Sequence, residues 1–273
     1  MTAGLAGRLA RRRAGWAAVA ALAVAVPAAS GERLVLAGGG DLPLRAKQRF
    51  VEWSGGSSAR ILVILWSTSE PKKNLKWLRE ELQPLGPASI EAAPLAPLKP
   101  KARALFLAQL GKATGVFFSG GDQARVMDVL RDRELLEALR ERYRAGVAFG
   151  GTSAGCAVMS SPMITGEGDF TVIDGDKVDT REGLGLLPGI IVDQHFLKRQ
   201  RENRLFGLVL KWPDTLGVCV DEATALLVED GRHGEVTGKG QVMLVDGRAE
   251  PGALILRLFH DGARLDLEQR RAE

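Results

Sequence analysis

The sequence GGTSAGC at residues 150–156 constrains the fold more than any other part of this 273-residue chain. The apolar residues before it predict a short buried strand, and the small residues after it predict the start of a helix. Gly151, Ser153 and Gly155 therefore match the pattern G-x-S-x-G at a sharp strand-to-helix turn. Such a turn is a nucleophile elbow, which holds its serine in a strained backbone conformation with the hydroxyl clear of the sheet.

Strand-like and helix-like segments alternate along the chain before and around this elbow. Continuous apolar runs, typical of strands covered on both faces, occur at residues 33–37, 60–65, 115–118 and 147–149. Helical patterns are found at residues 72–82, 101–110 and 124–144, the last as one long amphipathic helix, and a further helix is expected to start within 154–160. The alternation predicts a doubly wound, mostly parallel α/β sheet with its ligand site at the carboxyl ends of the strands.

Beyond the elbow the pattern changes to shorter apolar runs. Residues 185–196 lead into a polar segment, residues 216–228 predict a strand or hairpin, and closing strands are expected at 241–246 and 254–259.

Glycine-rich turns follow three of the predicted strands. The first, at residues 38–40, lacks the G-x-G-x-x-G pattern of a dinucleotide site and is followed by Pro43, so it predicts only a tight strand-to-helix connection. The second, at residues 119–123, and the elbow are expected to meet at one edge of the sheet.

Residues 1–30 have the composition of a secretory signal. Four arginines precede an apolar stretch at 16–26, and the segment contains no acidic residue. Small residues at 27–30 offer a cleavage site before Gly31. The apolar stretch is shorter than the ~17–25 residues that a transmembrane helix needs. We therefore expect export to the periplasm or the extracellular space, with residues 31–273 forming one domain.

The net charge gives no reason to expect binding to nucleic acid or to a membrane. The formal charge is +4, and the four arginines of the signal account for all of it. Cys156 and Cys219 are the only cysteines, and two small buried hydrophobic residues are favoured over a disulfide. With three histidines, the chain has no cluster with metal-ligand spacing, so neither a metal nor another cofactor is expected.

A serine nucleophile needs a base, which is usually a histidine held by a third group. His233 and His260 lie in polar turn sequences, where a surface position is expected. His195 instead ends an apolar run and lies in the polar sequence DQHF, so it is the candidate base. Glu222, at the end of another apolar run, is a candidate for the orienting carboxylate. The alternatives, which the spacing does not exclude, are Glu167, Asp169 and Asp174.

Basic residues follow His195 directly, namely Lys198, Arg199, Arg201 and Arg204. A solvated basic helix is the ordinary interpretation of such a run. Beside an active site, however, guanidinium groups are suited to binding carboxylates in a bidentate manner.

Four segments taken together resemble cyanophycinase, which belongs to a serine peptidase family shared with aspartyl dipeptidase. These segments are SGGDQ at 119–123, GGTSAG at 150–155, DQHF at 193–196 and DE at 221–222. They occur in the order and at the separations of that family. The resemblance implies a flavodoxin-like fold of the class I glutamine amidotransferase type.

The resemblance also implies roles for individual residues. Ser153 would be the nucleophile, His195 the general base and acid, and Glu222 the orienting carboxylate. The oxyanion hole would consist of the backbone N–H groups of Gly121 and Ala154. The implied substrate-binding residues are Gln123, Asp193, Gln194, Arg199, Arg201 and Arg204.

The expected substrate is cyanophycin, a poly-aspartate chain whose side chains each carry an arginine through an isopeptide bond, and the expected product is the β-Asp-Arg dipeptide. Cys156 replaces the alanine usual in the family, and Lys198 adds charge near the binding cluster, so the substrate preference is less firmly implied than the reaction. One alternative is an aspartyl dipeptidase that cleaves Asp-X dipeptides. Another is a catalytically inactive binding protein, and a homodimer is an assembly that the sequence leaves open.

Overall fold

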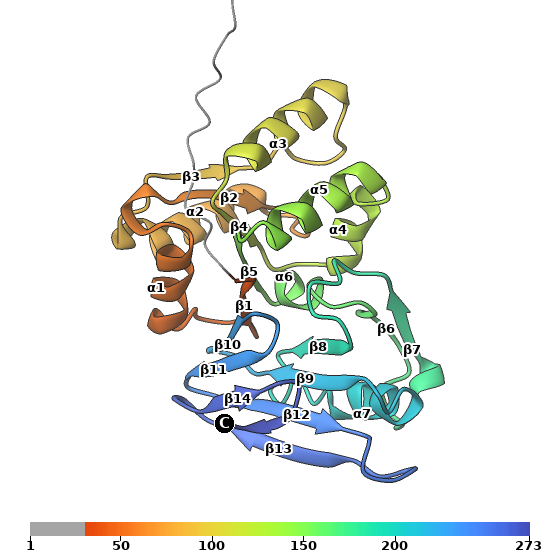
Figure 1. Ribbon diagram of the computed structural model, residues 1–273. Coiled ribbons are helices and arrows are strands. Elements are labelled where there is room, and N and C mark those ends of the chain that lie inside the picture. The colour runs from red at the N-terminus through yellow and green to blue at the C-terminus, as the bar shows by residue number, and fades with distance from the viewer. Residues whose placement is uncertain (1–30) are drawn as a thin grey trace, which may run out of the picture.

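The computed structural model describes residues 31–273, and the predicted signal at residues 1–30 lies outside the described residues. A nine-stranded sheet forms the centre of the molecule (Figure 1). One half of it consists of β1 (Arg33–Ala37), β2 (Arg60–Ile64), β3 (Ser89–Ala92), β4 (Gly115–Phe118) and β5 (Ala148–Thr152). These strands are parallel and have the order β1-β5-β4-β2-β3, so their carboxyl ends share one edge.

The other half of this sheet is antiparallel. It consists of β10 (Thr224–Glu229), β11 (His233–Gly238), β14 (Arg264–Asp266) and β15 (Arg271–Ala272). Strand β10 pairs with β1, and β11, β14 and β15 follow outward in that order.

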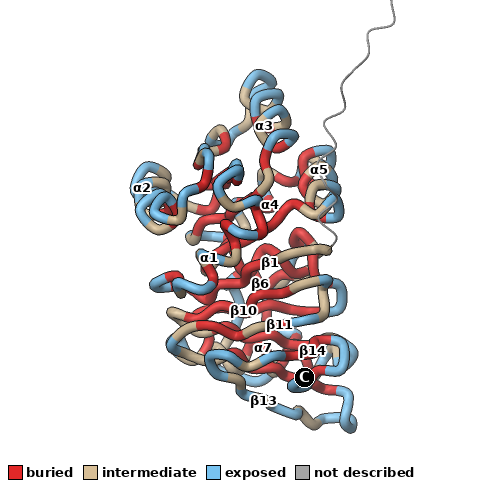
Figure 2. The backbone as a smooth tube through the Cα atoms, turned by 60° about the vertical axis from the view of Figure 1, so that its left-hand side comes forward, coloured by how far each residue is buried: buried red, intermediate tan, exposed pale blue. Residues whose placement is uncertain are grey.

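Helices cover both faces of the parallel half, which confirms the predicted doubly wound α/β fold. One face carries α1 (Leu44–Trp53) and α2 (Pro71–Leu82), and the other carries α3 (Pro100–Lys112), α4 (Gln123–Val129), α5 (Arg133–Arg144) and α6 (Ala154–Ala157). Successive side chains of a strand point to opposite faces, so Ile61 of β2 packs toward the first group and Leu62 toward the second. Burial on both faces explains the continuous apolar runs of these strands (Figure 2).

A second, four-stranded sheet has the order β13-β12-β9-β8. Its strands are β8 (Ile190–Gln194), β9 (Leu216–Val220), β12 (Val242–Asp246) and β13 (Ile255–Phe259). Helix α7 (Glu202–Lys211) connects the parallel strands β8 and β9 and packs on them through Leu205 and Leu208. The antiparallel pair β6 (Met163–Gly168) and β7 (Val178–Arg181) lies beside α7. The remaining elements are single 3₁₀ turns at Gly56–Ser58, Gln83–Leu85 and Gly175–Lys177.

Two of the predicted elements differ in the structure. The predicted long helix over 124–144 is wrong, because the chain forms α4 and α5 with a break between them. Asp132 causes the second start, since its side chain accepts hydrogen bonds from the backbone N–H groups of Glu134 and Leu135 and caps α5. The predicted strand or hairpin at 216–228 consists of β9 and β10, which belong to different sheets.

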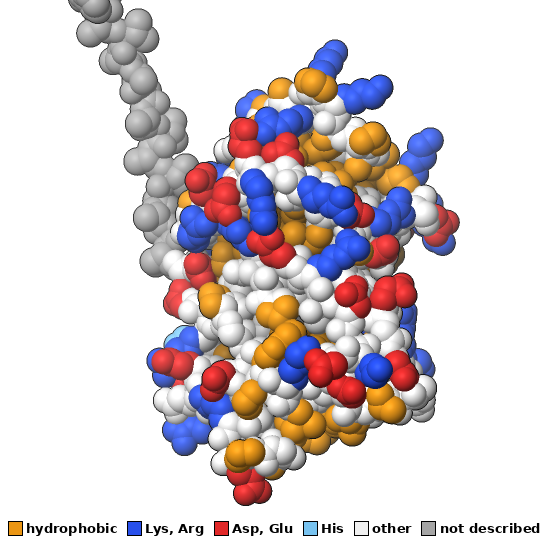
Figure 3. All heavy atoms as spheres, turned by 90° about the vertical axis from the view of Figure 1, so that its right-hand side faces the viewer, with side chains coloured by type: hydrophobic (Ala, Val, Ile, Leu, Met, Phe, Trp, Pro, Cys, Tyr) orange, Lys and Arg blue, Asp and Glu red, His pale blue; other side chains and the backbone are white. Residues whose placement is uncertain are grey.

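Charged side chains of both signs are mixed on the surface. Figure 3 shows Lys and Arg side chains together with Asp and Glu over the upper, helical part of one face. Arg103 of α3 pairs with Asp132 at 2.7 Å and with Glu134 at 2.5 Å, which links α3 to the start of α5. Such exposed pairs add little to the free energy of unfolding.

Within residues 31–273, none of the helices has both the length and the apolar character needed to cross a bilayer.

Candidate active site

The turn between β5 and α6 has the geometry of a nucleophile elbow. Ser153 has φ 54° and ψ −117°, a conformation that a non-glycine residue adopts only under strain, and its backbone N–H donates to the carbonyl oxygen of Ala37 at 3.0 Å. A side chain on Gly151 would collide with the backbone of Gly155, and one on Gly155 would collide with the carbonyl group of Phe118. The glycines of the motif are therefore required by close backbone approach.

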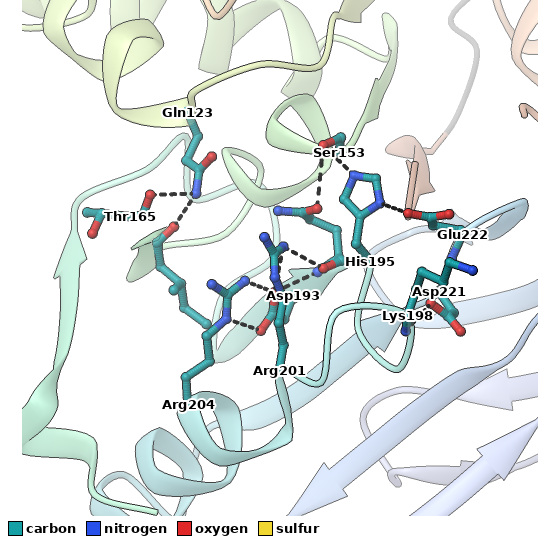
Figure 4. A network of polar contacts seen from close by, with 12 residues as sticks. Gln123, Ser153, Thr165, Asp193, His195, Lys198, Arg201, Arg204, Asp221 and Glu222 are labelled. Atoms are coloured by element: carbon teal, nitrogen blue, oxygen red, sulfur yellow. Dashed lines mark hydrogen bonds and ion pairs between the residues drawn. The ribbon is translucent and has the colours of Figure 1, made fainter. Parts of the chain in front are cut away.

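His195 lies directly after β8, and its imidazole faces the elbow (Figure 4). Its Nε2 atom is 2.8 Å from Ser153 Oγ, and the residue is only 6% exposed. The backbone N–H of His195 donates to the carbonyl oxygen of Gly38 at 2.9 Å, and a side chain on Gly39 would overlap the imidazole ring. The first glycine turn, predicted to be only a tight connection, thus makes room for this ring.

Glu222 completes a continuous hydrogen-bonded series. It lies between β9 and β10, where its Oε1 atom is 2.6 Å from His195 Nδ1. With Nδ1–H donating to this carboxylate, Nε2 is left as an acceptor for the Ser153 hydroxyl proton. Within residues 31–273, none of the three alternative acids pairs with His195: Glu167 is exposed on β6, Asp169 accepts hydrogen bonds from Thr171, and Asp174 caps the 3₁₀ turn at 175–177.

Asp221 ties the two loops that carry His195 and Glu222. Its Oδ1 atom accepts the backbone N–H of Glu222 at 2.9 Å and that of Lys198 at 3.2 Å. Figure 4 shows Asp221 next to Glu222 and Lys198. The sequence pattern marks Asp221 only as part of the DE motif, whereas its two bridging contacts give it a positioning role.

The surroundings of His195 favour the neutral imidazole. Burial is the largest influence and lowers the pKa of His195 below its usual value, and the hydrogen bond with Glu222 opposes it. The positive charges of Arg199 and Arg201 lower this pKa further. A neutral ring is the form that can accept a proton from the serine.

Two backbone donors lie at the predicted oxyanion hole. Among residues 31–273, no acceptor is paired with the N–H group of Gly121 or of Ala154. Gly121 has φ 139° and packs against the backbone of Ser67, while a side chain on Gly120 would lie 3.4 Å from Ser153 Cβ. The loop that carries Gly121 is thus held close to the nucleophile, as stabilisation of a tetrahedral intermediate requires.

Most of the predicted substrate-binding residues are engaged inside the protein. Asp193 and Arg204 form a bidentate ion pair with side chains 1% and 2% exposed. Arg201 donates to the carbonyl oxygen of Gln194 at 2.8 Å. Burial, with the charge of Arg204, lowers the pKa of Arg201 to about 10, so it remains protonated at neutral pH.

Gln123 is also buried, and its amide nitrogen donates to the carbonyl oxygens of Ile164 and Thr165 at 2.7 and 2.9 Å. The side-chain oxygen of Gln194 lies 3.4 Å from Ser153 Oγ, and Arg199 is exposed. Their direct contacts with a substrate stay predictions.

A cleft of about 510 Å³ opens beside Ser153 and His195. None of the six predicted substrate-binding residues lines it. Its walls instead come from the turn at 39–40, residues 67–70, helix α2 through Asn74 and Trp77, the loop 119–122 and Arg125. Of these residues, only the loop 119–122 was predicted to lie at the site. Residues 67–70, Asn74, Trp77 and Arg125 were not predicted, although they lie near the carboxyl ends of β2 and β4, at the edge where the ligand site was expected.

The other predictions about single residues concern histidines, cysteines and metals. His233 is exposed and pairs with Glu273, and His260 is exposed near the C-terminus. Cys156 and Cys219 are buried and not bonded to each other, as expected, and burial raises both thiol pKa values. The part of the chain that the structure describes contains no group of three or more His, Cys, Asp or Glu side chains arranged to hold a metal ion.

The chain is similar in sequence and in fold to known peptidases. Residues 34–236 match the family model "Peptidase family S51". A cyanophycinase of Trichormus variabilis is 34% identical over 229 residues, which cover 82% of this chain and 77% of the relative. A peptidase E of Salmonella paratyphi A is 27% identical over 134 residues, or 46% of this chain and 56% of the relative. The crystal structure of a peptidase from an acI-B1 Actinobacterium superposes with a TM-score of 0.66 at 21% identity, covering 86% of this chain and 97% of that one, which shows the same fold.

Proposed function

Because the chain belongs to peptidase family S51 and is a serine-type peptidase, we propose that it hydrolyses cyanophycin and releases β-Asp-Arg dipeptides as an exopeptidase. The observation that carries the proposal is the hydrogen-bonded series Ser153–His195–Glu222 beside an open cleft. Similarity to cyanophycinases over most of the chain supports the choice of substrate.

The arrangement accounts for hydrolysis through an acyl-enzyme. Ser153 Oγ attacks the scissile carbonyl carbon while its proton moves to His195 Nε2, and Glu222 stabilises the resulting imidazolium. The N–H groups of Gly121 and Ala154 donate to the oxyanion. Collapse of this intermediate breaks the C–N bond, and the imidazolium gives its proton to the leaving amine. Water, deprotonated by His195, then hydrolyses the ester and frees Ser153.

The proposal is tested by incubating the purified protein with insoluble cyanophycin and analysing the supernatant by mass spectrometry. β-Asp-Arg is expected with the native protein and not with Ser153→Ala. Dipeptide released equally by both proteins would rule out Ser153 as the nucleophile, and no dipeptide from either would rule out this substrate.

A second candidate is an aspartyl dipeptidase, which the similarity to peptidase E favours. It predicts hydrolysis of Asp-X dipeptides and no release from the polymer. The alternative of an inactive binding protein predicts that a serine-directed covalent probe labels neither the native protein nor Ser153→Ala.

We also propose that the protein is exported and that residues 31–273 form one peptidase domain. The basic and apolar composition of residues 1–30 supports export. Mass analysis of protein recovered from the periplasm or medium of a bacterial host should show an N-terminus near Gly31. Recovery of the whole chain from the cytoplasm alone would contradict this.

A further inference from the structure

One wall of the cleft is formed by a single face of helix α2. Glu70 precedes the helix as its N-cap, and Asn74 and Trp77 follow at spacings of four and three residues. Residues at these spacings lie on the same side of a helix, so a carboxylate, an amide and an indole ring line the cleft as one stripe. Trp77 is half-buried and packs against the apolar cluster between helices α1 and α2 and the sheet, which restricts the position of its ring.

The carboxylate of Glu70 is available to a ligand. Its partner is Lys73, with Nζ at 3.2 Å, and the two side chains are 61% and 73% exposed. Such a pair is worth little in water and is readily exchanged for another cation. By contrast, the carboxylate of Asp193 is buried and already paired with Arg204, so it is not available to a ligand.

The opposite wall carries two charged residues, Arg125 and Asp122, and Asp122 caps helix α4 by accepting the backbone N–H of Ala124. Helices α2 and α4 cover opposite faces of the sheet, so their residues reach the strand ends from two sides. Arg125 of α4 lines the cleft, is exposed, and forms no ion pair within residues 31–273. A substrate carboxylate can therefore meet Arg125 on this wall, and a substrate guanidinium can meet the exposed carboxylate of Glu70 on the α2 wall.

We propose that Glu70, Asn74 and Trp77 form the subsite for the guanidinium of an arginine side chain in the substrate. This inference rests on the proposed function and specifies which part of the polymer unit meets this wall. The planar cation stacks on the Trp77 ring and donates two parallel hydrogen bonds to the Glu70 carboxylate. The side-chain oxygen of Asn74 accepts a further N–H.

The test compares two short substrates, a β-Asp-Arg oligomer and the same oligomer with citrulline in place of arginine. Citrulline keeps the planar shape and loses the charge. The native protein should show kcat/KM about tenfold lower for the citrulline oligomer, equivalent to one charge-assisted hydrogen bond. In Glu70→Gln the ratio between the two substrates should fall toward one. The matched control Glu80→Gln, an exposed acid of the same helix outside the cleft, should keep the native ratio.

The outcomes separate this inference from the proposed function. If the native protein cleaves both oligomers at the same rate, or if Glu70→Gln keeps the native ratio, the guanidinium subsite is wrong and the peptidase assignment stands. If neither oligomer is cleaved, calorimetric binding of β-Asp-Arg to Ser153→Ala and to Ser153→Ala/Glu70→Gln decides. Binding at least about tenfold weaker in the double variant supports the subsite; equal binding, or none to either protein, overturns it.

Discussion

The carboxylate of Asp193 and the guanidinium of Arg204 form a bidentate ion pair. Asp193 is two residues before His195 in the chain. Asp193 belongs to β8 and Arg204 to α7, and the guanidinium also lies over the ring of Phe170, 5.3 Å from its centroid. A second acceptor role of Asp193, for the N–H of Gln194 at 2.7 Å, fixes the end of the strand that presents the imidazole. The pair therefore acts on the active site by holding the backbone that carries His195.

We expect Arg204→Met to lower the free energy of unfolding by about 3–5 kcal/mol, because it removes the bidentate partner of the buried Asp193 carboxylate and leaves only the longer contact with Arg201 at 3.9 Å. The double variant Asp193→Leu/Arg204→Met should lose clearly less, since the buried carboxylate is removed together with its bidentate partner and Arg201 keeps its hydrogen bond to the carbonyl oxygen of Gln194. Urea unfolding followed by circular dichroism measures both. If the double variant is as unstable as Arg204→Met, the buried carboxylate left without its bidentate partner is not the cause.

Asp221 is expected to act through the positions of Glu222 and His195. Asp221→Ala removes the acceptor for two backbone N–H groups, and we expect kcat to fall about tenfold with a smaller change in KM. Asp221→Asn keeps an oxygen at the same place and should recover most of the lost rate. Steady-state kinetics on a β-Asp-Arg oligomer check this. Equal defects in the two variants would show that the charge, rather than the bridge, is needed.

The sequence predicted the parts of the site that local patterns encode. The elbow around Ser153 follows from glycine spacing between an apolar strand and small residues, and the motifs of the family resemblance identified His195 and Glu222. The parallel half of the sheet was predictable because strands buried on both faces give continuous apolar runs. In the same way, the loop at 119–123 and the elbow were placed at one edge because both follow parallel strands.

The remainder depends on tertiary pairing that no local pattern contains. Arg204 and Asp193 are chemically suited to a substrate, and only the packing of α7 on β8 shows that they bond to each other. The helical hydrophobic pattern continues through Asp132, but the side chain of Asp132 caps the start of a new helix, α5. A capping hydrogen bond cannot be seen in hydrophobic periodicity. The cleft-lining stripe of α2 was missed for the same reason, since its face toward Ser153 is set by the sheet beneath it.

Gly39 is predicted to be essential for the position of His195. A side chain there would overlap the imidazole ring, so Gly39→Ala should displace the ring from Ser153 and reduce kcat/KM by at least about 100-fold. Gly39 also has φ 115°, which disfavours any side chain. Gly56→Ala is the matched control, because Gly56 has φ 60° and open space around its Cβ position. It should cost about 1 kcal/mol of stability and leave hydrolysis unchanged.

The pH dependence of hydrolysis is expected to reflect the lowered pKa of His195. Burial, aided by Arg199 and Arg201, lowers this pKa below the usual value of 6.5, so the neutral base persists into mildly acidic solution. The acid limb of kcat/KM against pH, which reports groups of the free enzyme, should have its midpoint below 6.5. Because the folded-state pKa is lower than the unfolded-state value, the stability contributed by this group should also decrease as pH falls through 6.5.

Arg199→Gln tests the electrostatic part of this prediction. Arg199 is exposed, so its replacement should leave the free energy of unfolding nearly unchanged. Loss of the positive charge stabilises the imidazolium and should move the acid limb to higher pH. Salt screens an exposed charge, so the difference between the native protein and Arg199→Gln should shrink as ionic strength rises. Rate profiles at low and high salt measure both effects, and an acid limb that moves to lower pH in Arg199→Gln would contradict the assignment of the limb to His195.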